Sequence, residues 1–191
     1  MSELHRCRTH GVTLTELLVS LAVSALLAVA AWPALGTLLH EHQAGQAADR
    51  LAASLALART TASARRTEVR LGPIRGAETL DRGWQLTALA ASPDGTTDTP
   101  GTTHNNNTGG IAPFSMVALH DRCLRITLRA TAGVSATQSL HLTPVGYSRS
   151  ERGGFLAATF LVRCHQAQRQ VRLGAQGRIR ICRPGASPDC D

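Results

Sequence analysis

The chain has 191 residues and a formal net charge of +7, from 20 basic side chains against 13 acidic ones. All 20 basic side chains are arginine, and 43% of the residues are hydrophobic. This composition excludes wholesale disorder and fits one domain with an additional segment. The excess of positive charge indicates an anionic partner or surface.

The first element is an uncharged apolar run of 23 residues at 17–39. A helix of about 20 such residues spans the hydrocarbon core of a bilayer. The basic residues Arg6 and Arg8 would also fit a signal peptide or an ordinary membrane anchor. Glu16 argues against a signal peptide, because a charge at the mouth of an apolar helix is costly and usually functional. We therefore expect a membrane helix over residues 17–39.

The residues at the start of this run carry a family motif. The sequence Gly11-Val12-Thr13-Leu14-Thr15-Glu16-Leu17-Leu18, after a short basic leader, resembles the class III signal of type IV pilins and type II secretion pseudopilins. The resemblance implies cleavage after Gly11 by prepilin peptidase and N-methylation of Val12. Two positions depart from the usual pattern, since Val12 replaces a Phe and Thr15 an Ile.

Glu16 then has a physical interpretation. A carboxylate in hydrocarbon is unfavourable unless it is paired. In a filament, the free amine of Val12 on a neighbouring subunit would pair with it and set the axial register between subunits. The alternative is that Glu16 only extends to the lipid headgroups.

The helix is expected to continue beyond the apolar run, to about residue 66. Apolar residues recur there at spacings of three and four, which places them on one helical face. We expect this face to pack on a globular domain. Its members are Ala44, Ala48, Leu51, Leu55, Ala58 and Ala62.

After residue 67 the hydrophobic period changes to two, which predicts short antiparallel strands and an α+β fold. The strands are expected near residues 67–71, 84–88, 124–128, 140–142, 160–163, 171–173 and 178–181. The polar, turn-rich residues 92–113 are interpreted as a mobile surface loop.

This layout most resembles the minor pseudopilin family that includes GspH and FimT. The matching features are Leu57-Ala58-Arg59 in the late helix, Gly83-Trp84 before a central strand, and a closing Gly-Arg-x-Arg hairpin. The resemblance implies a pilin fold with three parts: a leader at 1–11, an N-terminal helix at 12–66 and a periplasmic β-rich domain at 67–191. It also implies a single-pass inner-membrane protein whose partners are prepilin peptidase and other major and minor pilins or pseudopilins.

Four cysteines follow the membrane segment: Cys123, Cys164, Cys182 and Cys190. An even number beyond a membrane anchor indicates two disulfides in an oxidising compartment. Three pairings are possible. We favour Cys182–Cys190 with Cys123–Cys164, because in a simple meander Cys164 and Cys182 would lie two strands apart, about 10 Å. Zinc is the alternative, but no C-x-x-C pair is present.

The positive charge concentrates near the C-terminus, where residues 152–188 hold seven arginines and no acid. Alternation predicts that Ile179 and Ile181 face the core with Val171 and Leu173, and that the arginines between them face solvent. In the FimT branch, the Gly-Arg-x-Arg hairpin is associated with DNA binding in natural transformation. The resemblance therefore implies a DNA site at a pilus tip, and an arginine-rich solvated strand face is the alternative. The residues of the predicted site are Arg172, Gly177, Arg178, Arg180 and Arg183.

No catalytic residues, metal or cofactor are expected, because no HExxH, GxSxG, P-loop or GxGxxG motif occurs in the sequence. The alternative function is that of a type II secretion minor pseudopilin, which would act in pseudopilus assembly and protein secretion without binding DNA.

Overall fold

The computed structural model describes residues 13–89, 112–130, 139–149, 156–174 and 176–186. They form two compact units, Met1–Leu39 and His40–Asp191. One long helix, α1 (Leu14–Arg65), supplies residues to both units. Most of the expected loop at 92–113 lies outside the described residues.

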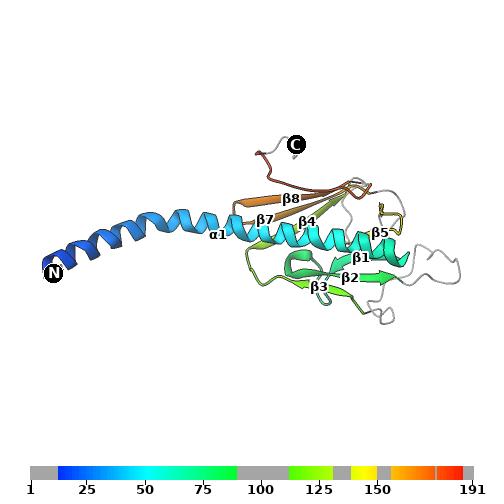
Figure 1. The fold of residues 1–191 in the computed structure, drawn as a ribbon, viewed down its shortest axis with the longest axis horizontal. Coiled ribbons are helices and arrows are strands. Elements are labelled where there is room, and N and C mark those ends of the chain that lie inside the picture. The colour runs from blue at the N-terminus through cyan, green and yellow to red at the C-terminus, as the bar shows by residue number, and fades with distance from the viewer. Residues whose placement is uncertain (1–12, 90–111, 131–138, 150–155, 175, 187–191) are drawn as a thin grey trace, which may run out of the picture. The chain divides into compact units, whose positions relative to one another are not determined.

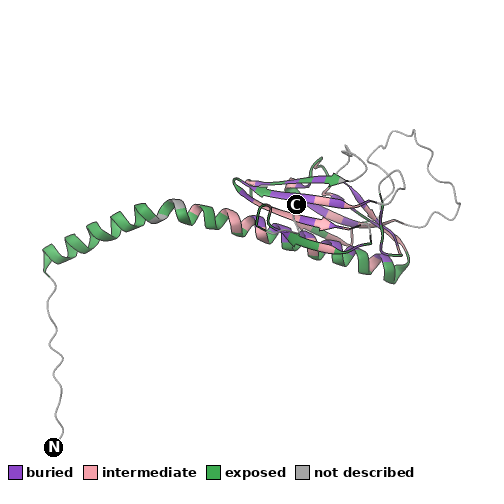
Figure 2. Ribbon diagram, turned by 90° about the horizontal axis from the view of Figure 1, so that it is seen from above, coloured by how far each residue is buried: buried purple, intermediate pink, exposed green. Residues whose placement is uncertain are grey.

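The described part of the first unit is the apolar part of α1, whose large hydrophobic side chains are exposed from Leu14 to Leu39. Figure 2 shows this stretch almost entirely as exposed residues. No single described helix has the length and composition needed to cross a membrane, but the bent pair Leu14–Ala30 and Ala34–Arg65 has both.

The second unit contains the rest of α1 and two antiparallel sheets (Figure 1). The five-stranded sheet has the order β3-β2-β1-β5-β6, and the four-stranded sheet has the order β4-β7-β8-β9. A short 3-10 helix, η1 (Leu80–Arg82), precedes β2. The strands are β1 (Glu68–Pro73), β2 (Gly83–Leu89), β3 (Ser115–Ala118), β4 (Leu124–Ala130), β5 (Leu140–Leu142), β6 (Ser148–Arg149), β7 (Ala158–Cys164), β8 (Ala167–Leu173) and β9 (Ile179–Cys182).

The core of this unit lies between α1 and the inner faces of both sheets. All six residues of the predicted helical stripe are 0% exposed, which confirms that this face packs on the globular unit. They share one cluster with Trp84 and Leu86 of β2 and with Phe160 and Val162 of β7. The long helix and the antiparallel sheets confirm the predicted α+β pilin fold.

Candidate nucleic-acid interface

The outer face of the four-stranded sheet is rich in arginine because of its register. Arg129 is opposite Thr159, Thr159 is opposite Arg172, and Arg172 is opposite Arg180, so these residues form one row across four strands. Residues that are directly paired across strands point to the same face. The sequences of β4, β7, β8 and β9 contain no aspartate or glutamate, so this row meets no carboxylate from its own strands.

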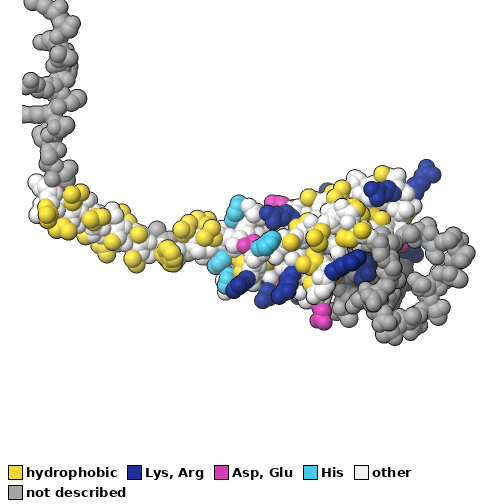
Figure 3. Space-filling view, turned by 90° about the horizontal axis from the view of Figure 1, so that it is seen from below, with side chains coloured by type: hydrophobic (Ala, Val, Ile, Leu, Met, Phe, Trp, Pro, Cys, Tyr) yellow, Lys and Arg dark blue, Asp and Glu magenta, His cyan; other side chains and the backbone are white. Residues whose placement is uncertain are grey.

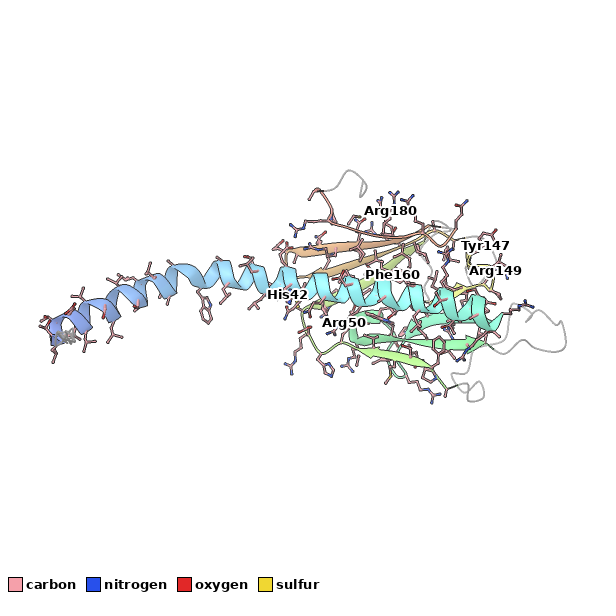
Figure 4. All side chains as sticks on the ribbon, in the orientation of Figure 1. His42, Arg50, Tyr147, Arg149, Phe160 and Arg180 are labelled. Carbon is pink, nitrogen blue, oxygen red and sulfur yellow. A yellow bond between two sulfur atoms is a disulfide. The ribbon has the colours of Figure 1, made fainter. Side chains whose placement is uncertain are left out.

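Two of the predicted DNA-binding residues therefore lie side by side. Arg172 is half-buried and Arg180 is exposed, and Figure 4 shows the Arg180 side chain pointing away from α1. Arg178 is exposed just before β9. Alternation along β8 and β9 predicted that these arginines face outward, but the predicted site did not include Arg129. Its signal was the same alternation in residues 124–128, which places every second residue after Arg125 on the outer face.

The prediction that Ile181 faces into the core is wrong. Ile181 is 43% exposed, although its cross-strand partner Val171 is 0% exposed. β9 is an edge strand of its sheet and has only β8 as a neighbouring strand. Its inner face is therefore less covered than the inner face of a central strand. Ile179 is partly buried and packs against the core, and Val171 and Leu173 are buried as expected.

Arg183 forms an ion pair with Glu41 of α1. Its Nη2 lies 2.9 Å from Oε2 of Glu41, and Nη2 of Arg169 lies 2.7 Å from the same oxygen. The hydrogen bond from Arg169 lowers the pKa of Glu41, burial opposes the shift, and the charges of Arg169 and Arg183 add to the lowering. Arg169 lies in the inward-facing row of β8 between Ala167 and Val171, a position that alternation could have identified.

Gly177 serves the packing of the hairpin. Its backbone φ is +79°, a conformation that favours glycine. A Cβ at this position would lie 2.6 Å from the carbonyl oxygen of Gly146 and 2.9 Å from Cζ of Arg59. Nη1 of Arg59 donates a hydrogen bond of 2.9 Å to the carbonyl oxygen of Gly177. The glycine therefore allows the turn between β8 and β9 to approach α1 closely.

A disulfide joins Cys123 and Cys164, with their Cα atoms 4.8 Å apart, as we favoured. β7 and β9 lie on opposite sides of β8, which is the expected meander. Cys182 is also disulfide-bonded, but Cys190 lies outside the described residues, so the Cys182–Cys190 pairing stays a prediction. Within the described ranges, no group of three or more His, Cys, Asp or Glu residues could hold a metal ion.

The processing motif is only partly visible. Gly11 and Val12 lie outside the described residues. Glu16 is exposed in the first turn of α1, where its backbone N–H donates to Oγ1 of Thr13 over 3.3 Å. In the single chain, the Glu16 side chain is thus accessible to another subunit.

One helix with an apolar N-terminal part and a C-terminal part packed on antiparallel sheets defines the class: a type IV pilin-like protein. Residues 6–32 match the prokaryotic N-terminal methylation motif, and residues 47–187 match the model of type II transport protein GspH. The chain belongs to this GspH family of minor pilins and pseudopilins, which is a family of structural proteins. The methylation motif and the N-terminal helix indicate a membrane-anchored component.

Two solved structures are similar to this chain at low identity, and the one with a TM-score above 0.5 shows the same fold. The type IV minor pilin FimU of Pseudomonas aeruginosa is 19% identical, with a TM-score of 0.52, over 78% of this chain and 96% of FimU. The minor pseudopilin EpsH from the type 2 secretion system of Vibrio cholerae is 16% identical, with a TM-score of 0.45, over 75% of this chain and 98% of EpsH. Among curated proteins, none matches this chain.

Proposed function

We propose that this protein is a minor pilin that assembles at or near the tip of a type IV pilus and binds DNA for uptake in natural transformation. The observation that carries the DNA proposal is the row of Arg129, Arg172 and Arg180 on strands without any acid. Arg178, just before β9, extends this positive surface. Arginine forks suit phosphate oxygens, and phosphate contacts supply affinity without sequence preference.

The N-terminal motif supports the assembly part of the proposal. Prepilin peptidase cleaves after Gly11, Val12 is N-methylated, and residues 17–39 anchor the protein in the inner membrane with residues 67–191 in the periplasm. In the filament, Glu16 pairs with the amine of Val12 on a neighbouring pilin. The exposed side chain of Glu16 is available for such a contact.

The test is duplex-DNA binding by residues 40–191, the compact unit that carries the arginine row. Binding should weaken steeply with salt, and Arg178→Ala with Arg180→Ala should lower both the affinity and the salt slope, by about two phosphate contacts. The matched control is Arg50→Ala with Arg82→Ala, which removes two exposed charges outside the four-stranded sheet. The DNA proposal would be wrong if residues 40–191 did not bind DNA at low salt, or if the control variant lost as much DNA affinity as the hairpin variant.

The second candidate is a type II secretion minor pseudopilin, which the family match over residues 47–187 favours. In this function the protein assembles with other pseudopilins and supports protein secretion without DNA. Deletion of the gene separates the two: loss of DNA uptake with normal secretion indicates the pilus, and loss of exoprotein secretion indicates the pseudopilus.

A further inference from the structure

A second positively charged feature lies on the same sheet, at the end of β4 and β7 that carries the disulfide. It is a pocket with a volume of about 360 Å³. Its lining holds two guanidinium groups and one imidazole and no carboxylate. The lining residues are Cys123, Arg125, Thr127, Leu161, Arg163 and His165.

The two arginines of the pocket are a like-charge pair. Arg125 and Arg163 are directly opposite each other on neighbouring strands, an arrangement that is destabilising without a compensating anion. Asp81 compensates Arg125 in part, with Oδ2 3.8 Å from its Nε. In the described part of the chain, Arg163 has no ion pair. A bound anion would relieve this repulsion, and two guanidinium groups fit a phosphate group.

The strand ends beneath the pocket are held in place by a disulfide and by contacts with α1. The Cys123–Cys164 disulfide lies next to the Arg125–Arg163 pair in the strand register. Oε1 of Gln43 on α1 lies 3.3 Å from both sulfur atoms. This contact is not a hydrogen bond, because the sulfur atoms of a disulfide carry no proton. Nε2 of the same amide donates to Oδ1 of Asp121 over 3.2 Å. These links hold the ends of β4 and β7 against the helix before any ligand arrives.

The position of the pocket along α1 indicates what fills it. The ring of His165 contacts that of His40, with centroids 4.2 Å apart and the ring planes tilted by 36°. His40 directly follows residue 39, the last of the apolar run. In Figure 3, histidine side chains gather beside arginines at this end of the globular unit. The Gly177 turn, by contrast, packs on Arg59, 19 residues or about 28 Å further along the helix.

We propose that this pocket binds the phosphate of an anionic phospholipid headgroup. The inference rests on the proposed insertion of residues 17–39 in the inner membrane, which places His40 at the headgroup level. It does not depend on DNA binding, because the β8–β9 turn, which carries Arg178 of the proposed DNA site, contacts α1 at Arg59 near the C-terminal end of the helix. The bound lipid would hold the base of the globular unit against the membrane surface before the subunit enters a filament.

The test uses the full chain in detergent with added phosphatidylglycerol or phosphatidylcholine, and native mass spectrometry measures lipid occupancy. The wild type should prefer phosphatidylglycerol, and Arg125→Gln with Arg163→Gln should lower that preference about 10- to 30-fold, the effect of two arginines at an anionic surface. The matched control, Arg178→Gln with Arg180→Gln, should keep it. Thermal unfolding checks that both variants fold.

Three results of the lipid and phosphate measurements would overturn the proposal: an unchanged preference in the pocket variant, an equal loss in both variants, or binding of inorganic phosphate at the pocket without any lipid preference. A DNA arm separates the two proposed sites. If the pocket variant loses duplex-DNA affinity as strongly as the hairpin variant, the pocket belongs to the DNA interface and the lipid assignment is wrong. If neither the wild type nor the variants bind DNA while the wild type keeps its lipid preference, only the DNA proposal fails.

Discussion

Arg59 of α1 donates a hydrogen bond of 2.9 Å to the carbonyl oxygen of Gly177, 118 residues later in the chain. The bond ties the turn that carries Arg178 to the helix, and Gly146 closes the same contact from another loop. The position of the proposed DNA-binding arginines therefore depends on the packing of Gly177 against Arg59 and Gly146.

Gly177→Ala should destabilise the globular unit by more than about 3 kcal/mol, because backbone strain at positive φ adds to a clash with two neighbouring groups. Gly185→Ala is the matched control. Gly185 has a φ of +73°, and nothing lies within 4 Å of its added Cβ, so only the strain of about 1 kcal/mol remains. Denaturant unfolding of residues 40–191 measures both. Equal losses would mean that the contact with Arg59 and Gly146 contributes nothing.

Ser54→Ala should cost about 1–3 kcal/mol, because it leaves a buried donor without a partner. Nε1 of Trp84, which is 0% exposed, donates to Oγ of Ser54 over 2.9 Å. Ser63→Ala on the same helix is the control, since Ser63 is exposed and its hydroxyl donates to the carbonyl oxygen of Thr60 within the same helix. Both changes gain helix propensity, so the difference between their unfolding free energies isolates the Trp84 bond. A difference near zero would contradict the prediction.

Period and spacing predicted most of the fold. The 3.6-residue period of the helix placed all six stripe residues in the core, and the period of two located seven of the strands. The sequence did not predict β3 (Ser115–Ala118) or β6 (Ser148–Arg149). They are short edge strands that lack a long alternation, and their pairing depends on distant partners.

The candidate site was less predictable, because its contacts link residues far apart in the sequence. Counting charges put Arg169 and Arg183 in one basic tail, but both bond Glu41 of the helix, more than 120 residues earlier. Alternation gives the face on which a side chain lies, but it does not identify the residue across the core. For the same reason the Arg125–Arg163 pocket was missed, because it requires the register between β4 and β7.

The Cys123–Cys164 disulfide should be a major source of stability. It closes a separation of 41 residues, for which loop-closure entropy predicts about 4 kcal/mol. Cys123→Ala with Cys164→Ala should lower the free energy of unfolding by that order and leave the Cys182 disulfide intact. Urea unfolding without reductant makes the comparison. A loss under about 1 kcal/mol would show that the unfolded chain is already constrained there.

Glu41→Gln should weaken the acid dependence of stability. Because the hydrogen bond from Arg169 lowers the pKa of Glu41 below its ordinary 4.5, its stabilising effect is fully present above that pH. It is lost as the pH falls through the lower folded pKa. The variant should be less stable than the wild type at pH 7 and should lose less stability on acidification.

Asp49→Asn is the control for this change, since Asp49 is an exposed carboxylate on the same helix. Unfolding curves recorded at steps from pH 7 to pH 3 compare the three proteins. If Asp49→Asn flattened the acid limb as much as Glu41→Gln, the contacts with Arg169 and Arg183 would not be its cause.

Glu16→Ala should leave the protein in the membrane but prevent its entry into filaments. Glu16 is exposed in the first turn of α1, and an unpaired carboxylate in hydrocarbon is costly, so the amine of Val12 on a neighbouring subunit stabilises it only in the assembled state. Immunoblots of sheared filaments and of the membrane fraction measure both pools, with Asp49→Ala as a control that removes a carboxylate outside the apolar run. Normal incorporation of Glu16→Ala would mean that Glu16 only extends to the headgroups.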